Sequence, residues 1–228
     1  LDGTSGFLLS LKMSQAMNRS FANVLFGAFG KAPEEGAAAA TGPAQASYNL
    51  ATEEDALAVL EAAQSLVIVP GYGMAVSQAQ HATHELAQAL EERGVQVRYA
   101  VHPVAGRMPG HMNVLLAEAN VPYDQIYDLD QINDEFARTD AVLVVGANDV
   151  VNPAARDNPG SPIYGMPVFR VDEAQAVIVL KRSMNPGFAG IENELFVRPN
   201  TLMVLGDAKQ TLRDLLAGLK GTRRLAHG

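Results

Sequence analysis

The residues best suited to chemistry are two adjacent cations, Lys181 and Arg182, which are followed by Ser183 at the end of an apolar run. Two cations and a hydroxyl make a suitable set of donors for a phosphate group, which carries nearly two negative charges and several acceptor oxygens. Solvated cations at a strand end are the ordinary alternative. The set favours a ligand with an extra phosphate, such as the 2′-phosphate that distinguishes NADP from NAD.

A glycine pair, Gly71 and Gly73, follows another apolar run and opens a helical pattern, with Val76 where the third glycine of a dinucleotide fingerprint would lie. Glycines let the backbone approach a pyrophosphate, and a helix N-terminus favours its charge. A pair that merely makes a strand-to-helix turn is the alternative. The acidic residue that usually ends the next strand and binds the ribose of NAD is missing here, which argues against ordinary NAD recognition.

Two further loops carry polar groups. Gly106 and Arg107 lie in a flexible cationic turn suited to a phosphate or to docking, with an exposed basic loop as the alternative. Asn148 and Asp149 follow the apolar run 141–146, where an amide can bond a carboxamide and a carboxylate can change its protonation state. An Asx turn explains the same two residues without any ligand.

The sequence lacks the motifs of metal sites, of cysteine chemistry and of hydrolytic or phosphoryl-transfer enzymes. His81, His84 and Glu85 share a helical pattern without the order of a zinc motif, so no metal site is predicted. The chain has no cysteine, which removes disulfides, thiolate metal sites and a cysteine nucleophile. No nucleophile elbow or Walker lysine is present, and this argues against hydrolysis and phosphoryl transfer.

Composition and charge bound the class of protein. The chain has 228 residues, 48% of them hydrophobic, and a net charge of -8. It can therefore bury a substantial core, and the acidic balance argues against a nucleic-acid partner. Residues 1–30 are basic and mildly apolar, and they fit either an amphipathic surface helix or the end of a membrane domain. We expect residues 31–50 to be an Ala/Gly/Pro-rich linker and residues 51–228 to form the nucleotide-binding domain that the motifs above indicate.

Alternating apolar runs and helical patterns position these groups. A capped helix begins after Thr52, and further helices are predicted over 76–93, 112–119, 130–138 and 208–219. Strands are predicted over 65–70, 95–101, 141–146, 167–171, 177–180 and 202–205. The pattern predicts an α/β fold with a doubly wound (Rossmann-like) parallel sheet of about six strands and helices on both faces. The ligand crevice of such a sheet lies at the carboxyl ends of its strands.

Several long motifs resemble one known family. "PGYGMAVSQAQ", "VLVVGANDVVNPAARDNPGSPIYGMPV", "VLKRSMNPGFAGIENELF" and "MVLGDAK" closely resemble the NADP(H)-binding domain, the third domain in the beta subunit, of proton-translocating NAD(P) transhydrogenase. The match extends over about residues 65–219, and "SQAMNRSFANVLFGAFG" resembles the end of the last membrane helix in that family.

The resemblance implies an activity. NADH held by an NAD(H)-binding domain or alpha subunit would exchange hydride with NADP+ held here, coupled to proton translocation through a membrane domain. It also implies a dimeric assembly on the cytoplasmic face of the bacterial inner membrane, with NADP(H) as cofactor. A self-sufficient soluble NADPH-dependent reductase and a non-catalytic NADPH-sensing module are the alternatives, although no Tyr-x-x-x-Lys pair supports the reductase.

The resemblance also implies a set of site residues. Lys181, Arg182 and Ser183 would hold the 2′-phosphate, and residues 183–188 would fold over the nucleotide. The remaining cofactor-binding residues would be Gly71, Tyr72, Gly73, Val76, Val104, Ala105, Gly106, Arg107, Met108, Pro109, Gly146, Ala147, Asn148, Asp149, Val150, Gly165, Met166, Met184, Asn185, Pro186, Gly187, Phe188, Asp207 and Ala208. Asp149 would communicate proton binding, with no acid or base needed for hydride transfer. Phe188 stands where members of the family often have tyrosine.

Overall fold

The structure, a computed structural model, describes residues 48–226. The predicted membrane-proximal segment, 1–30, and nearly all of the predicted linker, 31–50, lie outside the described residues. Within residues 48–226 six strands form one sheet in the order β3-β2-β1-β4-β5-β6, and every neighbouring pair is parallel. The strands are β1 (Ser65–Pro70), β2 (Gln96–Ala100), β3 (Ile126–Tyr127), β4 (Ala141–Val145), β5 (Ala176–Lys181) and β6 (Thr201–Leu205). The predicted doubly wound fold is confirmed.

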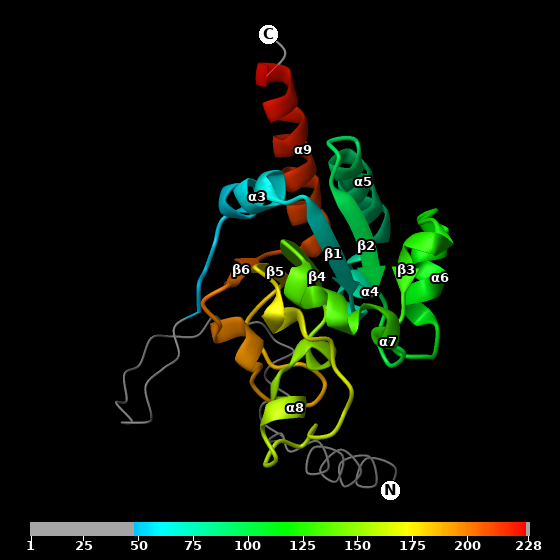
Figure 1. Cartoon of the computed structure of the whole chain (residues 1–228), viewed down its shortest axis with the longest axis vertical. Coiled ribbons are helices and arrows are strands. Elements are labelled where there is room, and N and C mark those ends of the chain that lie inside the picture. The colour runs from blue at the N-terminus through cyan, green and yellow to red at the C-terminus, as the bar shows by residue number, and fades with distance from the viewer. Residues whose placement is uncertain (1–47, 227–228) are drawn as a thin grey trace, which may run out of the picture. The chain divides into compact units, whose positions relative to one another are not determined.

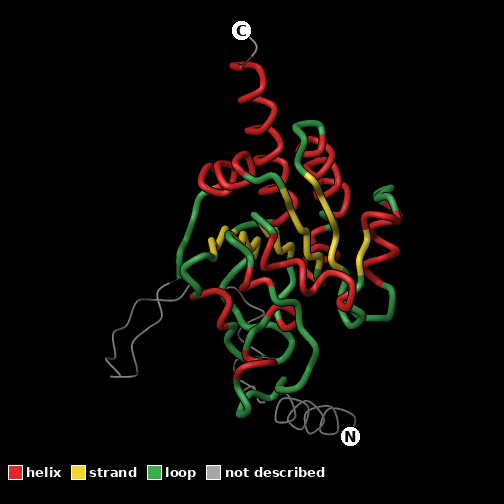
Figure 2. Tube along the Cα trace, viewed as in Figure 1, coloured by secondary structure: helices red, strands yellow, loops and turns green. Residues whose placement is uncertain are grey.

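Helices precede, connect and follow the strands, as the tube of Figure 2 shows. They are α3 (Glu53–Ala62), α4 (Tyr72–Ser77), α5 (Gln80–Glu91), α6 (His111–Glu118), α7 (Leu129–Ile132), α8 (Ala154–Asp157) and α9 (Ala208–Ala226). The predicted start of α3 is correct: Thr52 caps it, and Asp55 bonds back to the Thr52 backbone in a reciprocal capping box. None of the helices in the described range is long and apolar enough to cross a membrane.

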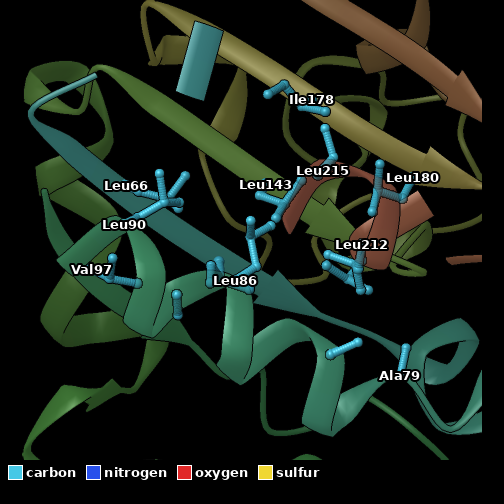
Figure 3. Close-up of a cluster of buried hydrophobic side chains, with 14 of the residues drawn as sticks. Leu66, Ala79, Leu86, Leu90, Val97, Leu143, Ile178, Leu180, Leu212 and Leu215 are labelled. Atoms are coloured by element: carbon cyan, nitrogen blue, oxygen red, sulfur yellow. The ribbon is translucent and has the colours of Figure 1, made fainter. Parts of the chain in front are cut away.

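The sheet is buried on both faces, which is why its strands read as continuous apolar runs. Helices α3, α5, α6 and α9 cover one face, and Figure 3 shows leucines of α5 and α9 pointing toward Leu66, Leu143 and Ile178 of the sheet. Short 3₁₀ helices and Phe169 pack on the other face. In Figure 1 the arrows of β1 and β2 point toward the part of the domain that holds α8, so the loops after the strands gather there.

Three predicted elements are wrong in detail. No strand forms over 167–171, because the backbone N–H groups of Phe169 and Arg170 donate to Val150 and to the Asn133 side chain instead of to a neighbouring strand. The sheet still has six strands because of β3, which the sequence did not predict; its two residues are too few to give an apolar pattern. The predicted helix 76–93 is two helices, α4 and α5, because Gln78 adopts a left-handed conformation (φ 50°) between them. The predicted helix 130–138 is α7 followed by a 3₁₀ helix over Asn133–Arg138.

Candidate functional site

A cleft of about 310 Å³ lies at the carboxyl edge of the sheet, around the point where the strand order reverses between β1 and β4. Loops after β1, β4, β5 and β6 contribute its lining. The lining residues are Gly73, Val76, Ser77, Gly146, Ala147, Asn148, Leu180, Lys181, Arg182, Ser183, Asn185, Pro186, Gly187, Gly206, Asp207 and Ala208. Ligands of doubly wound sheets bind at this switch point. The structure therefore brings together residues from four of the loops that the sequence singled out.

The predicted glycine pair makes contact with the loop after β4. The Gly73 N–H donates to the Gly146 carbonyl at 2.9 Å, and the Gly71 N–H donates to the Val145 carbonyl at 2.9 Å. A Cβ atom on Gly71 would lie within 2.5 Å of the Ala147 nitrogen, and one on Gly73 would lie 2.7 Å from the Gly146 Cα. Glycine is thus required here by the close approach of two loops, which shapes the floor of the cleft.

Lys181 is half-buried at the end of β5. Its ammonium lies 5.4 Å from the centroid of the Phe196 ring and donates to the Asn185 carbonyl of the loop that follows. Burial lowers the pKa of Lys181, and the nearby Asp149 carboxylate opposes that shift. An ammonium removed from water interacts strongly with an anion that reaches it.

The two neighbours of Lys181 complete a set of phosphate donors. Among residues 48–226, Arg182 makes no hydrogen bond or ion pair, and its exposed guanidinium borders the cleft with the half-buried Ser183. In the adjacent loop after β6, whose Gly206 N–H donates to the Lys181 carbonyl at 2.9 Å, Asp207 accepts from the Gln210 N–H and so caps α9 with its own carboxylate. Within the described residues neither cation has an ion-pair partner, and two such cations beside a hydroxyl fit a phosphate group, so the residues present fit the extra phosphate of NADP(H).

Asp149 lies behind the loop over residues 183–190, which we call the lid. Its Oδ2 accepts from the Ala189 N–H at 3.0 Å. Its Oδ1 is buried without a hydrogen-bond partner in the described part of the chain, and a Cβ on Gly187 would lie 2.8 Å from that oxygen. The carboxylate therefore contacts the lid directly, although it does not line the cleft.

Tyr72 and Arg107 form a separate cluster with His111. The Arg107 guanidinium carbon lies 4.7 Å from the centroid of the Tyr72 ring, and the Arg107 backbone N–H donates to His111 Nδ1 at 3.1 Å. This cluster joins the loop after β2 to the start of α4, at the same edge of the sheet as the cleft. Neither residue lines the cleft itself.

The structure separates the remaining predictions from the cleft lining. Val150 is buried in the core and Met184 packs against it, whereas the Phe188 side chain is fully exposed. The predicted residues outside the lining are Gly71, Tyr72, Val104, Ala105, Gly106, Arg107, Met108, Pro109, Asp149, Val150, Gly165, Met166, Met184 and Phe188. Sequence reasoning missed Ser77, Leu180 and Gly206. Each of the three is the sequence neighbour of a predicted residue, so extending each predicted loop by one residue would have included it.

The family model and the curated relatives agree on one family. The family model described as "NAD(P) transhydrogenase beta subunit" matches residues 1–218. Two relatives from Rhodospirillum rubrum, each named "NAD(P) transhydrogenase subunit beta", are 54% identical over 220 residues, which is 96% of this chain and 47% of theirs. The chain thus spans about half the length of these curated relatives.

Solved structures give only distant likenesses. A Sir2 homologue in complex with NAD covers 77% of this chain and 97% of its own, with a TM-score of 0.47 and 11% identity. A putative thiamin diphosphate-dependent enzyme from Mycobacterium smegmatis covers 72% of this chain and 27% of its own, with a TM-score of 0.44 and 15% identity. Neither likeness bears on function.

Proposed function

The chain belongs to the NAD(P) transhydrogenase beta subunit family, and we propose on that premise that the described domain binds NADP(H) in the cleft at the carboxyl edge of its sheet. Hydride then passes between NADH on a partner domain and NADP+ held here. The partners are the NAD(H)-binding alpha subunit and the membrane domain through which protons move. A dimeric assembly on the cytoplasmic face of a bacterial inner membrane belongs to the same proposal.

The observation that carries the proposal is the placement of Lys181, Arg182 and Ser183 on one wall of the cleft. Two cations beside a hydroxyl suit the 2′-phosphate, which NADP(H) carries and NAD(H) lacks. A hydrogen bond to a charged group contributes about 1.5–3 kcal/mol. Two such contacts are enough to discriminate NADP(H) from NAD(H) decisively.

The protein's part in the reaction is placement. The bound nicotinamide ring exchanges hydride directly with a second nicotinamide ring, so the chain supplies no acid or base at the reacting carbon. The loops after β1 and β4 orient the nucleotide, and the lid over residues 183–190 excludes water from it. Asp149, in contact with that lid through the Ala189 N–H, communicates proton binding to it.

The free energy released when a proton crosses the membrane is large enough for such gating. Moving one charge across 100 mV is worth about 2.3 kcal/mol, and about 1.4 kcal/mol is a tenfold change in an equilibrium. One proton per hydride therefore shifts the ratio of NADPH to NADP+ by some tens-fold. A lid that alternates between closed and open forms is sufficient to use a drive of this size.

Calorimetric titration of the purified chain with NADP+ and with NAD+ tests the proposal. We expect NADP+ to bind at least about 100-fold more tightly, since 1.4 kcal/mol is a tenfold change. In Arg182→Ala and in Lys181→Met, which keeps the apolar stem beside Phe196, the preference should fall by about tenfold or more. Arg138→Ala, at an exposed ion pair with Glu135, is the matched control and should change neither affinity. Equal binding of the two nucleotides by the wild-type chain would refute the proposal.

A further inference from the structure

Asn193 is a buried residue outside the cleft that contacts a cleft residue. It lies at the start of the 3₁₀ helix Glu194–Val197, where its Oδ1 accepts from the Leu195 N–H at 2.9 Å. Its Nδ2 donates to the backbone carbonyl of Asn148 at 2.9 Å and to Asn148 Oδ1 at 3.0 Å. One side chain thus joins the segment after the lid to the loop after β4.

Backbone groups at both ends fix the orientation of the Asn193 amide. The Leu195 N–H is only a donor, so the atom facing it must be Oδ1. The Asn148 carbonyl is only an acceptor, so the atom facing it must be Nδ2. The second hydrogen of that Nδ2 then points at the Asn148 side chain, which must present its oxygen. The polarity of Asn148 therefore follows from two backbone groups, through Asn193.

The amide nitrogen of Asn148 faces the opposite way, toward the lid. A Cβ on Gly187 would lie 2.7 Å from Asn148 Nδ2, and both residues line the cleft. Within residues 48–226 this Nδ2 donates no hydrogen bond to the protein. The cleft thus presents an amide donor at this point, and an amide with the reverse orientation would present an acceptor.

We propose that Asn193 is a positioning residue that fixes the polarity of Asn148, so that the cleft offers an N–H donor to an oxygen acceptor on the nicotinamide half of the ligand. The inference rests on the proposed function for the identity of that ligand, and it takes Asn148, on the loop after β4, to face the half that does not carry the phosphate bound by Lys181 and Arg182 on the loop after β5. The carboxamide oxygen and a pyrophosphate oxygen on the nicotinamide side, both of which 2′,5′-ADP lacks, are acceptors of the required kind. Asn193 touches neither the ligand nor the reacting atoms, and acts only through Asn148.

Asn193→Asp is the sharpest variant, because the change is isosteric. The new carboxylate can still accept from the Leu195 N–H, but it has no hydrogen to donate to Asn148. Facing a carboxylate, the Asn148 amide turns to donate toward it and presents its oxygen to the cleft. We expect the dissociation constant for NADP+ to rise about tenfold, and that for 2′,5′-ADP, which lacks the nicotinamide half, to stay within twofold.

Asn200→Asp is the matched control. Asn200 also donates from Nδ2 to two backbone carbonyls, those of Asp172 and Ala174, at 3.2 and 2.8 Å. None of these residues lines the cleft, so both nucleotides should bind within twofold of the wild type. Should Asn193→Asp fail to fold, Asn193→Ser gives the same contrast, since a hydroxyl can accept from Leu195 but cannot make both donations. Thionicotinamide-NADP+ separates the two acceptors: a smaller effect of the variant on this analogue identifies the carboxamide oxygen.

Three results would overturn the inference. If Asn193→Asp weakens NADP+ and 2′,5′-ADP equally, or weakens neither, Asn193 does not set the polarity of the cleft. A nuclear Overhauser effect between the Asn148 side-chain amide protons and the Gly187 Hα protons in the free wild-type chain gives a ligand-independent readout. Its absence would also overturn the inference. If the wild-type chain binds no NADP+, the proposed function fails, and the Overhauser measurement alone decides the orientation.

Discussion

At the scale of single residues, the ammonium of Lys181 is poised for an anion. Burial lowers its pKa and the Asp149 carboxylate opposes the shift, so the protein itself supplies part of the counter-charge. A bound phosphate adds a closer negative charge, which favours the protonated form of the lysine further. Phosphate binding therefore stabilises the protonated form of Lys181, which is the form that binds phosphate.

Asp149→Asn tests the proposed link between proton binding and the lid. The fold should remain, because an asparagine oxygen can still accept from the Ala189 N–H. The rate of NADPH release, followed by nucleotide fluorescence, should depend less on pH in the variant than in the wild-type chain. Asp134→Asn, at an exposed carboxylate paired with Arg170, is the control and should keep the wild-type profile. Identical profiles for wild type and Asp149→Asn would exclude Asp149 from the gating step.

The site residues that could be predicted from the sequence are those whose own side chains would contact the ligand. The adjacent cations Lys181 and Arg182 at a strand end indicate an anion-binding site, and both line the cleft in the structure. Asn193 could not be found in this way, because its contribution depends on two hydrogen bonds to a residue 45 positions away. An asparagine before a short helix reads as an ordinary cap, and only the tertiary partner reveals more.

At the scale of elements, the contact between the loops after β1 and β4 sets the shape of the cleft. Gly71→Ala places a Cβ within 2.5 Å of the Ala147 nitrogen, and backbone atoms cannot yield as a flexible side chain can. We expect the free energy of unfolding, measured in urea, to fall by about 1–3 kcal/mol, and NADP+ affinity to fall with it. Gly160→Ala, in an exposed turn with a nearest contact of 3.4 Å, should change the free energy of unfolding by less than about 0.5 kcal/mol. A fully stable Gly71→Ala would show that the loops separate readily.

The residues over 167–171 explain why one predicted strand was wrong. Apolar alternation shows that Phe169 and Val171 are buried, but it does not say whether the neighbouring N–H groups pair with a strand. Here Phe169 donates to Val150 and Arg170 donates to Asn133, so the segment packs across one face of the sheet as irregular backbone. The strands β1, β4, β5 and β6 were predicted well because their runs are long and buried on both faces.

His102 ties the end of β2 to this irregular segment. Its Nε2–H donates to the Pro167 carbonyl at 2.8 Å, and its Nδ1 accepts from the Val104 N–H at 3.2 Å, which requires the neutral ring. Burial lowers the pKa of His102 below 6.5. The folded chain therefore binds fewer protons than the unfolded chain at acidic pH, and stability that is complete above about pH 6.5 is lost as the pH falls.

His102→Gln tests this expectation through urea unfolding at pH 7.5 and pH 5.5. The wild-type chain should lose more unfolding free energy than the variant on acidification, because protonation of the buried ring favours the unfolded chain. His84, whose pKa is also lowered by burial, contributes equally to both chains and cancels. His81→Gln, on an exposed helix face, should keep the full wild-type loss. The same loss in His102→Gln would assign the acid sensitivity to other groups.

At the scale of the whole molecule, a chain with a net charge of -8 gathers cations at one edge of its sheet. Long-range attraction of an anionic nucleotide is therefore weak, and recognition depends on contacts inside the cleft. That arrangement suits a domain that receives NADP(H) and holds it, with the second nucleotide supplied by a partner. It suits a self-sufficient reductase less well, because such an enzyme needs a pocket for a second substrate.

Hydride transfer should accordingly require the partner. With NADPH loaded, the purified chain alone should reduce neither NAD+ nor small carbonyl compounds, because in the proposed function the second nucleotide is held by the partner. Adding the NAD(H)-binding alpha subunit should produce transfer to 3-acetylpyridine-NAD+, followed by absorbance, and Arg182→Ala should lose that transfer at NADPH concentrations that saturate the wild type. Reduction of a carbonyl compound by the chain alone would favour a self-sufficient reductase. Tight NADPH binding with no transfer in the presence of the alpha subunit would instead favour a sensing module.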